Sequence, residues 1–308
     1  PVLIVRWASD PHLDLFFPAA AAALMQLGLV LAAFGAWRLG EILIARGSAR
    51  WLVAGARGRS ISISGAAARA AMTASFGLAI ASLLGVAVWS FASSWRFPDD
   101  LPAAWTLENW LRASLAGPAW TTLGVAACAT GLALVLAILC LENETRRGLD
   151  GRRALWALYA PLLIPQVSFL IGAQAVLVRL DADGAFAALV WAHLLFVLPY
   201  VFLALAEPWR KLDPRYVRTA LCLGVSPARA FFAVKLPLLA RPLLAACAIG
   251  FAVSVALYLP TLFAGGGRWS TLTTEAVTLS SGGDRRVLGV HAFAQAALPL
   301  LVYAAALA

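Results

Sequence analysis

The sequence offers few of the residue combinations with which enzymes do chemistry. It contains no HExxH motif, no carboxylate pair beside an evident pocket, and no nucleophile with a base at a recognisable spacing. The glycine-rich stretch 265–286 lacks the GxxxxGK[ST] spacing of a phosphate loop and reads either as a flexible connection or as a contact surface for another protein. The 4 cysteines form no CxxC pair. We therefore expect no enzymatic activity and no cofactor or metal bound by this chain.

Polar side chains inside apolar runs are the next candidates for function. Such groups are costly at membrane depth and usually face a bundle interior or a cavity. Gln166 and Gln174 lie about two helical turns apart, and His291 and Gln295 about one turn apart, so each pair shares a helix face. With them we place Ser168 and His193 as candidates to line a path for a solute. The alternative is that each one hydrogen-bonds one helix to another.

The composition is that of a membrane protein. Of 308 residues, 62% are hydrophobic and only 13% are charged, against about a quarter charged in soluble domains. The net charge of +9 does not indicate nucleic-acid binding, because no basic stripe is interleaved with exposed aromatic residues. We expect an all-α, polytopic transmembrane helix bundle in contact with lipid, and no nucleic-acid partner.

Seven apolar runs have the length, about 20 residues, that a helix needs to cross a bilayer. They are residues 15–44, 72–95, 118–141, 154–178, 185–206, 238–263 and 291–308. Of the 24 Lys and Arg residues, 17 fall in the segments 38–69, 146–153 and 210–241, and only 7 fall elsewhere. Because positive charge marks the cytoplasmic side, we place these three segments in the cytoplasm.

A polar segment with many helix stop and start signals, residues 207–237, separates the fifth and sixth runs. Asp213 is suited to cap a short helix with Pro214 at its first position. Gly224 suits the left-handed residue that stops such a helix. We name residues 207–237 the elbow.

A second short helix should follow in the elbow. Ser226 and Pro227 are typical of a helix start, and Pro237 is expected to end that helix. Two short helices therefore meet at a glycine turn. A basic segment of this kind is either a docking surface or a solvated loop that keeps positive charge on the cytoplasmic side.

Two segments outside the spans also carry predictions. Residues 47–71, rich in Gly, Ala, Ser and Arg, are expected to be a cytoplasmic linker between residues 1–46 and a second unit, residues 72–308. Leu107, Trp110, Leu111 and Leu115 recur at helical spacing. They predict a short helix at the membrane interface, with its aromatic ring among the headgroups; an irregular surface loop is the alternative.

The elbow resembles the EAA loop of ABC importer permeases from Arg218 onward. The shared pattern is a small residue at Ala220, then Gly224, then nine residues before Val234-Lys235-Leu236-Pro237. The family usually has Glu and Ala where this chain has Arg218 and Thr219. The glutamate through which that loop usually makes an acidic contact with the ATPase is therefore replaced by an arginine in this chain.

The resemblance extends to the MetI-like permease domain over roughly residues 72–308. It includes the strings TLENW, PLLIPQ, AHLLFVLPYVF and FAVSVALYLPTLFAGGGRWSTL. Within that superfamily the chain looks most like one half of the fused permeases of thiamine and ferric-iron importers. Tyr258 and Thr261 stand where related importers often carry a Gly-Glu-Phe-type motif, and they join the candidates for the solute pathway.

The resemblance implies a permease subunit of an ATP-driven importer of the bacterial inner membrane. Such a subunit moves a small solute, for example thiamine, iron or a polyamine, by alternating access. Its partners would be ATPase subunits that carry the ATP and Mg, a periplasmic substrate-binding protein, and a second permease half. On this reading residues 1–46 would hold the last span of a preceding half. The implied ATPase-docking residues are Arg215, Arg218, Ala220, Gly224, Ser226, Pro227, Val234, Leu236 and Pro237.

Two other functions fit parts of the sequence. An ion-coupled secondary transporter would use ionisable side chains within its spans, yet Asp and Glu are nearly absent from these runs. A membrane scaffold subunit without transport activity would need neither a glycine elbow nor polar groups inside the bundle.

Overall fold

The computed structural model describes residues 2–8, 12–53, 62–95, 99–148, 152–282 and 284–307. These residues form helices and turns, and within them the single β contact is an isolated bridge between Ala92 and Trp105. The helices are α1 (Val2–Ala8), η1 (Leu13–Leu15), α2 (Phe16–Val53), α3 (Ser62–Phe91), α4 (Glu108–Arg112), α5 (Ala116–Arg147), α6 (Arg152–Leu163), α7 (Gln166–Arg179), α8 (Phe186–Lys211), α9 (Arg215–Cys222), α10 (Pro227–Ala230), η2 (Phe231–Lys235), α11 (Leu236–Leu238), α12 (Ala240–Ala256), α13 (Leu259–Ala264), α14 (Leu272–Ser280) and α15 (Arg285–Leu307). The all-α expectation is confirmed.

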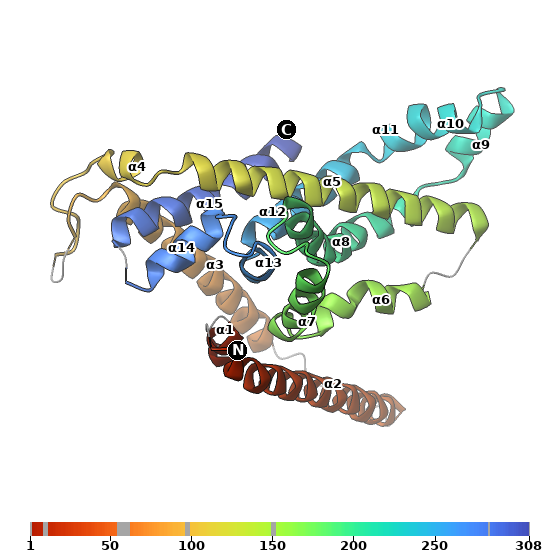
Figure 1. Ribbon diagram of the computed structural model, residues 1–308. Coiled ribbons are helices and arrows are strands. Elements are labelled where there is room, and N and C mark those ends of the chain that lie inside the picture. Colours follow the sequence, from red (N-terminus) through yellow and green to blue (C-terminus); the bar gives the residue numbers. More distant parts are fainter. Residues whose placement is uncertain are drawn as a thin grey trace.

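The centre of the bundle is a three-helix unit of α5, α8 and α12 (Figure 1). Small residues on α5, such as Ala133 and Ala137, are fully buried and let the helices approach closely. Val197 and Val201 of α8 fill the space opposite them, and Ala246 of α12 completes the layer. This close packing fixes the positions of three helix ends next to the elbow: the carboxyl ends of α5 and α8 and the amino end of α12.

The remaining helices pack around this centre. Helix α15 lies against α3, α12 and α14, while α13 lies against α7 and α8. At the periphery, α1 and α2 contact α7. Most of α2 and α3 is exposed, with only 11% and 0% of their apolar windows buried. In a bilayer those surfaces are free to face lipid or another subunit.

The number of membrane spans agrees with the sequence only if bent helix pairs are counted. Among the described residues, five helices are long and apolar enough to cross a bilayer, and two further bent pairs raise the total to seven. The first pair is α6 with α7, bent by 103°, and the second is α10–α11 with α12, bent by 71°. The apolar run 154–178 is therefore formed by two helices that meet at a bend.

Proline accounts for the first bend. Pro165 has no amide hydrogen and holds an extended ψ of 124°, so the chain leaves α6 and restarts as α7. Pro161, Pro199 and Pro299, by contrast, lie inside helices that continue past them. A proline in a span thus marks a weak point, and the neighbouring packing decides whether the helix breaks.

Two further predicted segments lie at least partly within the described residues. The helices α2 and α3 extend into both ends of the segment 47–71, whose middle lies outside the described residues. The expected interfacial helix is only the five-residue α4, and Trp110 stacks on Phe91 at 5.5 Å and meets Phe293 edge-on at 6.1 Å. The indole of Trp110 is therefore part of the intramolecular packing, while Leu107 and Leu111 remain exposed.

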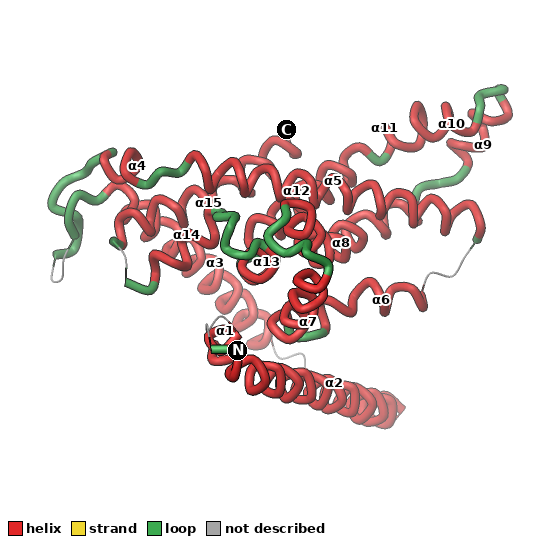
Figure 2. Tube along the Cα trace, in the orientation of Figure 1, coloured by secondary structure: helices red, strands yellow, loops and turns green. Residues whose placement is uncertain are grey.

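The elbow and α4 lie at opposite ends of the molecule (Figures 1 and 2). At one end, α9, α10 and α11 extend beyond the bundle, near the carboxyl ends of α5 and α8. At the other end lie α4 and the turn between α14 and α15. If the elbow is cytoplasmic, as the charge distribution indicates, α4 and that turn face the opposite side.

Candidate functional site

The first half of the elbow follows the capping signals in the sequence. After α8, Leu212 is extended, and the Asp213 carboxylate accepts a hydrogen bond from the backbone N–H of Arg215 at 2.9 Å. Pro214 then precedes the first turn of α9. The predicted start of this short helix is confirmed.

Gly224 adopts the left-handed conformation, with φ of +82°. The chain turns there because the N–H groups of Gly224 and Val225 bond back to Leu221 and Ala220 at 3.0 and 3.1 Å. No atom lies within 4 Å of the position that a Cβ would occupy at Gly224. Backbone conformation, and not lack of space, is what favours glycine at this position.

The second half of the elbow is more continuous than expected. The Ser226 hydroxyl accepts a weak hydrogen bond from the Arg229 N–H at 3.4 Å, and Pro227 occupies the first turn, as predicted. The helix then continues through the π-helical turn η2 and through Pro237, and the bend to α12 comes at Leu239. The helix thus ends at Leu238, one residue past Pro237 and close to the predicted end.

A buried ion pair fastens the elbow to the bundle. The Lys235 ammonium lies 2.6 Å from the Glu142 carboxylate of α5, and the two side chains are only 8% and 17% exposed. The same ammonium lies 4.5 Å from the centre of the Trp209 ring of α8. Arg146 contacts the other oxygen of Glu142 at 2.7 Å. Elbow, α5 and α8 are thus joined at one point.

A second connection lies next to the first. Arg210 of α8 donates two hydrogen bonds to the Glu144 carboxylate of α5, at 2.9 and 3.0 Å. Such bidentate pairs fix orientation as well as distance. Sequence reasoning did not identify these pairs; the available signal was a Glu-x-Glu string at the end of an apolar run, in a chain with few acidic residues.

The outer side of the elbow is exposed and mixed in character. Leu223 and Phe232 are 78% and 67% exposed, and Arg215, Arg218 and Arg229 are also exposed. Between the elbow and the ends of α5 and α8 lies a cavity of about 790 Å³. Its lining includes Glu142, Glu144, Arg146, Arg210, Arg218, Val217, Phe231 and Lys235.

The predicted docking residues do not all share this outer side. Arg215, Arg218, Gly224, Ser226, Pro227 and Pro237 are exposed, whereas Ala220, Val234 and Leu236 are partly buried. Leu236 packs against the core of the bundle. The elbow therefore has an inner face that contacts the bundle and an outer face that is available to a partner.

A buried polar cluster occurs where α12 breaks. The two ring nitrogens of His193 lie 2.9 Å from the Ser254 hydroxyl and 3.0 Å from the Thr261 hydroxyl. Thr261 also donates to the backbone oxygen of Leu257 at 3.2 Å. This cluster ties α8, α12 and α13 together, which is the helix-bridging role weighed for these residues. Ser254 was not among the predicted residues.

The other predicted pathway residues are dispersed. Ser168 donates to the backbone oxygen of Ala23 in α2 at 2.8 Å, and His291 contacts the Val287 oxygen in its own helix at 3.1 Å. Gln166, Gln174, Tyr258 and Gln295 are partly buried. None of the eight lines the elbow cavity or the cavity of about 480 Å³ beside α14 and α15. Their role in a pathway stays a prediction.

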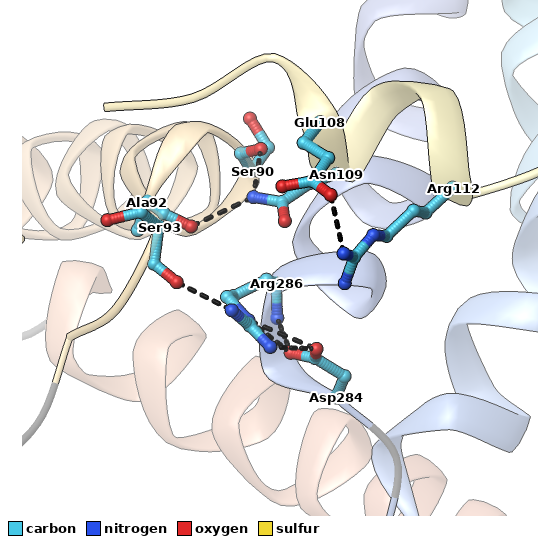
Figure 3. Close-up of polar contacts among 8 residues, drawn as sticks. All are labelled: Ser90, Ala92, Ser93, Glu108, Asn109, Arg112, Asp284 and Arg286. Carbon is cyan, nitrogen blue, oxygen red and sulfur yellow. Dashed lines mark hydrogen bonds and ion pairs between the residues drawn. The ribbon is translucent and has the colours of Figure 1, made fainter. Parts of the chain in front are cut away.

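The end opposite the elbow is held by polar contacts between α3, α4 and α15. Figure 3 shows the buried Asn109 amide donating to the backbone oxygens of Ser90 and Ala92, at 3.1 and 2.9 Å. Arg286 donates to the oxygen of Ser93 and pairs with Asp284 (Figure 3). Because the Arg286 guanidinium bonds its carboxylate, the pKa of Asp284 is held below its ordinary value.

The glycine-rich stretch beside this end is folded. Thr271 and Thr274 form a reciprocal cap at the start of α14, and the Leu272 N–H donates to the Thr122 hydroxyl of α5 at 3.0 Å. A flexible connection is therefore the wrong description for residues 272–280. Within the described residues, no three His, Cys, Asp or Glu side chains are grouped so as to hold a metal ion.

Comparison with known proteins supports the resemblance to ABC importer permeases. No protein-family model matches the chain. It is 45% identical over 176 residues to the inner membrane ABC transporter permease protein YnjC of Escherichia coli (strain K12), across 57% of this chain and 33% of YnjC. It is 27% identical over 144 residues to the putrescine transport system permease protein PotI of the same strain, across 44% of this chain and 50% of PotI.

A third relative comes from a Streptomyces species. The chain is 28% identical over 180 residues to the diacetylchitobiose uptake system permease protein NgcG of Streptomyces coelicolor, across 56% of this chain and 59% of NgcG. The chain thus spans between 33% and 59% of these relatives' lengths. All three are named as permease proteins, which confirms the resemblance to ABC importer permeases of the MetI-like type. The resemblance to one half of a fused permease stays a prediction.

Proposed function

We propose that this chain, a homologue of ABC importer permeases, forms part of the membrane channel of an ATP-driven importer in the bacterial inner membrane. The observation that carries the proposal is the construction of the elbow. Its outer face is exposed at the end of the bundle, and its inner face is joined to α5 and α8 through Lys235, Glu142 and Trp209. A force applied to the outer face is therefore transmitted to the helices of the bundle centre.

The proposed cycle follows from this arrangement. ATPase subunits, which bring the ATP and Mg, seat on the elbow and move when they bind and hydrolyse ATP. The elbow passes that movement to α5, α8 and α12, and the bundle changes the side on which its path is open. A substrate-binding protein would deliver the solute at the opposite end, near α4 and the α14–α15 turn. A second permease half would complete the channel, and this chain would supply no catalytic group.

The identity of the solute is a separate matter. Two of the relatives are named for different solutes, putrescine and diacetylchitobiose. A cationic amine and a neutral sugar share little recognition chemistry, so the feature that such permeases have in common is the coupling to an ATPase. The proposal accordingly rests on the elbow and not on the polar residues inside the bundle.

The test is association with an ATPase. The full-length protein is purified in detergent together with the ATPase subunit of its own transport system, and ATP hydrolysis by the pure complex is measured. Leu223→Asp places a carboxylate on the exposed apolar tip of the elbow and should abolish the association. Leu111→Asp is the matched control, because Leu111 is 85% exposed on α4 at the other end of the molecule.

Two results are informative. Retention of the ATPase by the control and its loss with Leu223→Asp would support the proposal. If the native protein holds no ATPase, or if both variants retain it equally, the elbow is not the docking element and the proposal fails.

A further inference from the structure

The elbow exposes positive charge that the described residues neutralise only in part. Arg215 lies 4.0 Å from the Asp213 carboxylate, which already accepts a backbone hydrogen bond. Arg218 and Arg229 make no ion pair with any described residue. The elbow thus exposes these basic side chains together with the apolar side chains of Leu223 and Phe232, and Arg218 also borders the cavity toward α5 and α8.

The cavity between the elbow and the ends of α5 and α8 also has more basic than acidic lining residues. Four of its lining residues are basic, namely Arg146, Arg210, Arg218 and Lys235, and two are acidic, Glu142 and Glu144. Both acids are already paired: Glu142 contacts Lys235 and Arg146, and Glu144 contacts Arg210. Arg218 is the cavity cation left without a carboxylate among the described residues.

The surroundings of Arg218 favour a carboxylate as its partner. Val217, Leu221 and Phe231 also line this cavity, so apolar side chains border it together with Arg218. A guanidinium beside apolar walls gains more from a bidentate carboxylate than one in open solvent, because the local dielectric is lower. Apolar residues surrounded by charged ones are also the usual composition of a protein interface.

We propose that the surface of the ATPase subunit that receives the elbow is acidic, with carboxylates facing Arg218 and Arg229 and one of them entering the mouth of the cavity beside Arg218. This inference rests on the proposed function and specifies the chemistry of its partner. The same charge distribution predicts fast association that weakens with salt.

The test measures the affinity of the full-length protein for its ATPase subunit. The permease is held in nanodiscs of zwitterionic lipid, and the dissociation constant is measured at low and at high salt. The decisive variant is Arg218→Glu with Arg229→Glu, which reverses both charges. Arg218→Lys with Arg229→Lys keeps them, and Arg147→Glu reverses an exposed charge at the end of α5, outside the elbow.

The expected result is a loss of at least about tenfold in affinity at low salt for the double reversal, because each like-charged contact opposes binding. The lysine variant should stay within about threefold of the native protein, and Arg147→Glu should be unchanged. The native affinity should fall with salt, and the affinity of the reversed variant should not.

Three outcomes would overturn the inference. If the double reversal binds as tightly as the native protein while Leu223→Asp abolishes binding, the ATPase still docks on the elbow but its surface is not acidic. If the reversal removes binding to vesicles containing phosphatidylglycerol and leaves the ATPase affinity unchanged, the basic face serves lipid. If the native protein does not bind the ATPase at all, the proposed function fails together with the inference.

Discussion

At the scale of single residues, the contact between Lys235 and Glu142 joins the elbow to α5. Two charges removed from water lose hydration, so a buried pair stabilises a structure only when its geometry and its other partners compensate. Here the Trp209 ring faces the ammonium at 4.5 Å, and Arg146 holds the second carboxylate oxygen at 2.7 Å. The pair therefore specifies where the elbow meets the bundle.

Removing one partner of this pair should be costly. Lys235→Met leaves Glu142 buried with Arg146 as its remaining partner, and we expect a loss of about 2 to 4 kcal/mol in the free energy of unfolding in detergent. Glu142→Gln alone should also destabilise the protein, and combining the two should cost less than the sum. A double-mutant cycle with a coupling below about 0.5 kcal/mol would show that the pair is not a structural connection.

The pair of Asp284 and Arg286 at the opposite end predicts a dependence on pH. Hydrogen bonding to Arg286 lowers the pKa of Asp284 in the folded protein below its ordinary value of 3.8. A lowered folded-state pKa contributes stability that is fully present above the unfolded pKa and is lost as the pH falls through the folded one. The contribution is small, because both side chains are about one-third exposed.

The measurement compares the native protein with Asp284→Asn by thermal unfolding in detergent at several pH values. The native protein should be the more stable at pH 7, and the difference should shrink below about pH 4 as the carboxylate is protonated. A difference that is constant across this range would mean that the charge of Asp284 contributes nothing.

At the scale of elements, the turn at Gly224 sets the angle between the two short helices. Since no atom lies within 4 Å of a Cβ built there, a substitution tests the φ of +82° alone. Gly224→Val should strain the turn by about 1 to 2 kcal/mol and reduce ATP-coupled uptake. Gly224→Asn, which tolerates the left-handed region, should retain most of the uptake. Equal activity of the two variants would contradict the proposed geometry of the elbow.

The approach of α12 to α5 and α8 depends on a second glycine. A Cβ at Gly250 would lie 2.6 Å from a methyl carbon of Val201 and 3.0 Å from the methyl carbon of Thr130. We expect Gly250→Ala to destabilise the protein by about 1 to 3 kcal/mol, because this core has no space for the added methyl group.

Two variants check the explanation for Gly250. Combining Gly250→Ala with Val201→Ala should restore part of the lost stability, measured as the free energy of unfolding. Gly131→Ala is the control: no atom lies within 4 Å of its Cβ position, and the higher helix propensity of alanine should leave the stability equal or improved. A loss as large at Gly131 as at Gly250 would rule out steric crowding as the cause.

At the scale of the whole molecule, the sequence predicted local features better than contacts between distant segments. The caps at Asp213 and Ser226 and the turn at Gly224 depend on neighbouring residues, and the structure has them as predicted. The bend at Pro165 and the straight passage through Pro199 could not be separated, because both are prolines in apolar runs. Packing around each one decides the outcome.

Contacts between distant segments were the part that could not be predicted. Glu142 and Lys235 are 93 positions apart, and nothing in either local sequence names the other. Trp110 carried the signature of an interfacial aromatic residue, yet Phe91 and Phe293 enclose its ring. A single sequence gives the type of a residue and its place on a helix, whereas its neighbours across the bundle come from the fold.

The orientation of the whole molecule in the membrane yields the last prediction. The elbow and the α14–α15 turn lie at opposite ends (Figure 1), and positive charge puts the elbow in the cytoplasm. Cys222 is exposed on the elbow, and Ser281 is exposed on the turn.

With the other three cysteines replaced by alanine, Cys222 should resist a membrane-impermeant maleimide in intact spheroplasts and react in inside-out vesicles. The Ser281→Cys variant, with Cys222 also replaced by alanine, should show the reverse pattern. Labelling of Cys222 in intact spheroplasts would place the elbow on the side that has no ATP, and the importer mechanism proposed here would then be impossible.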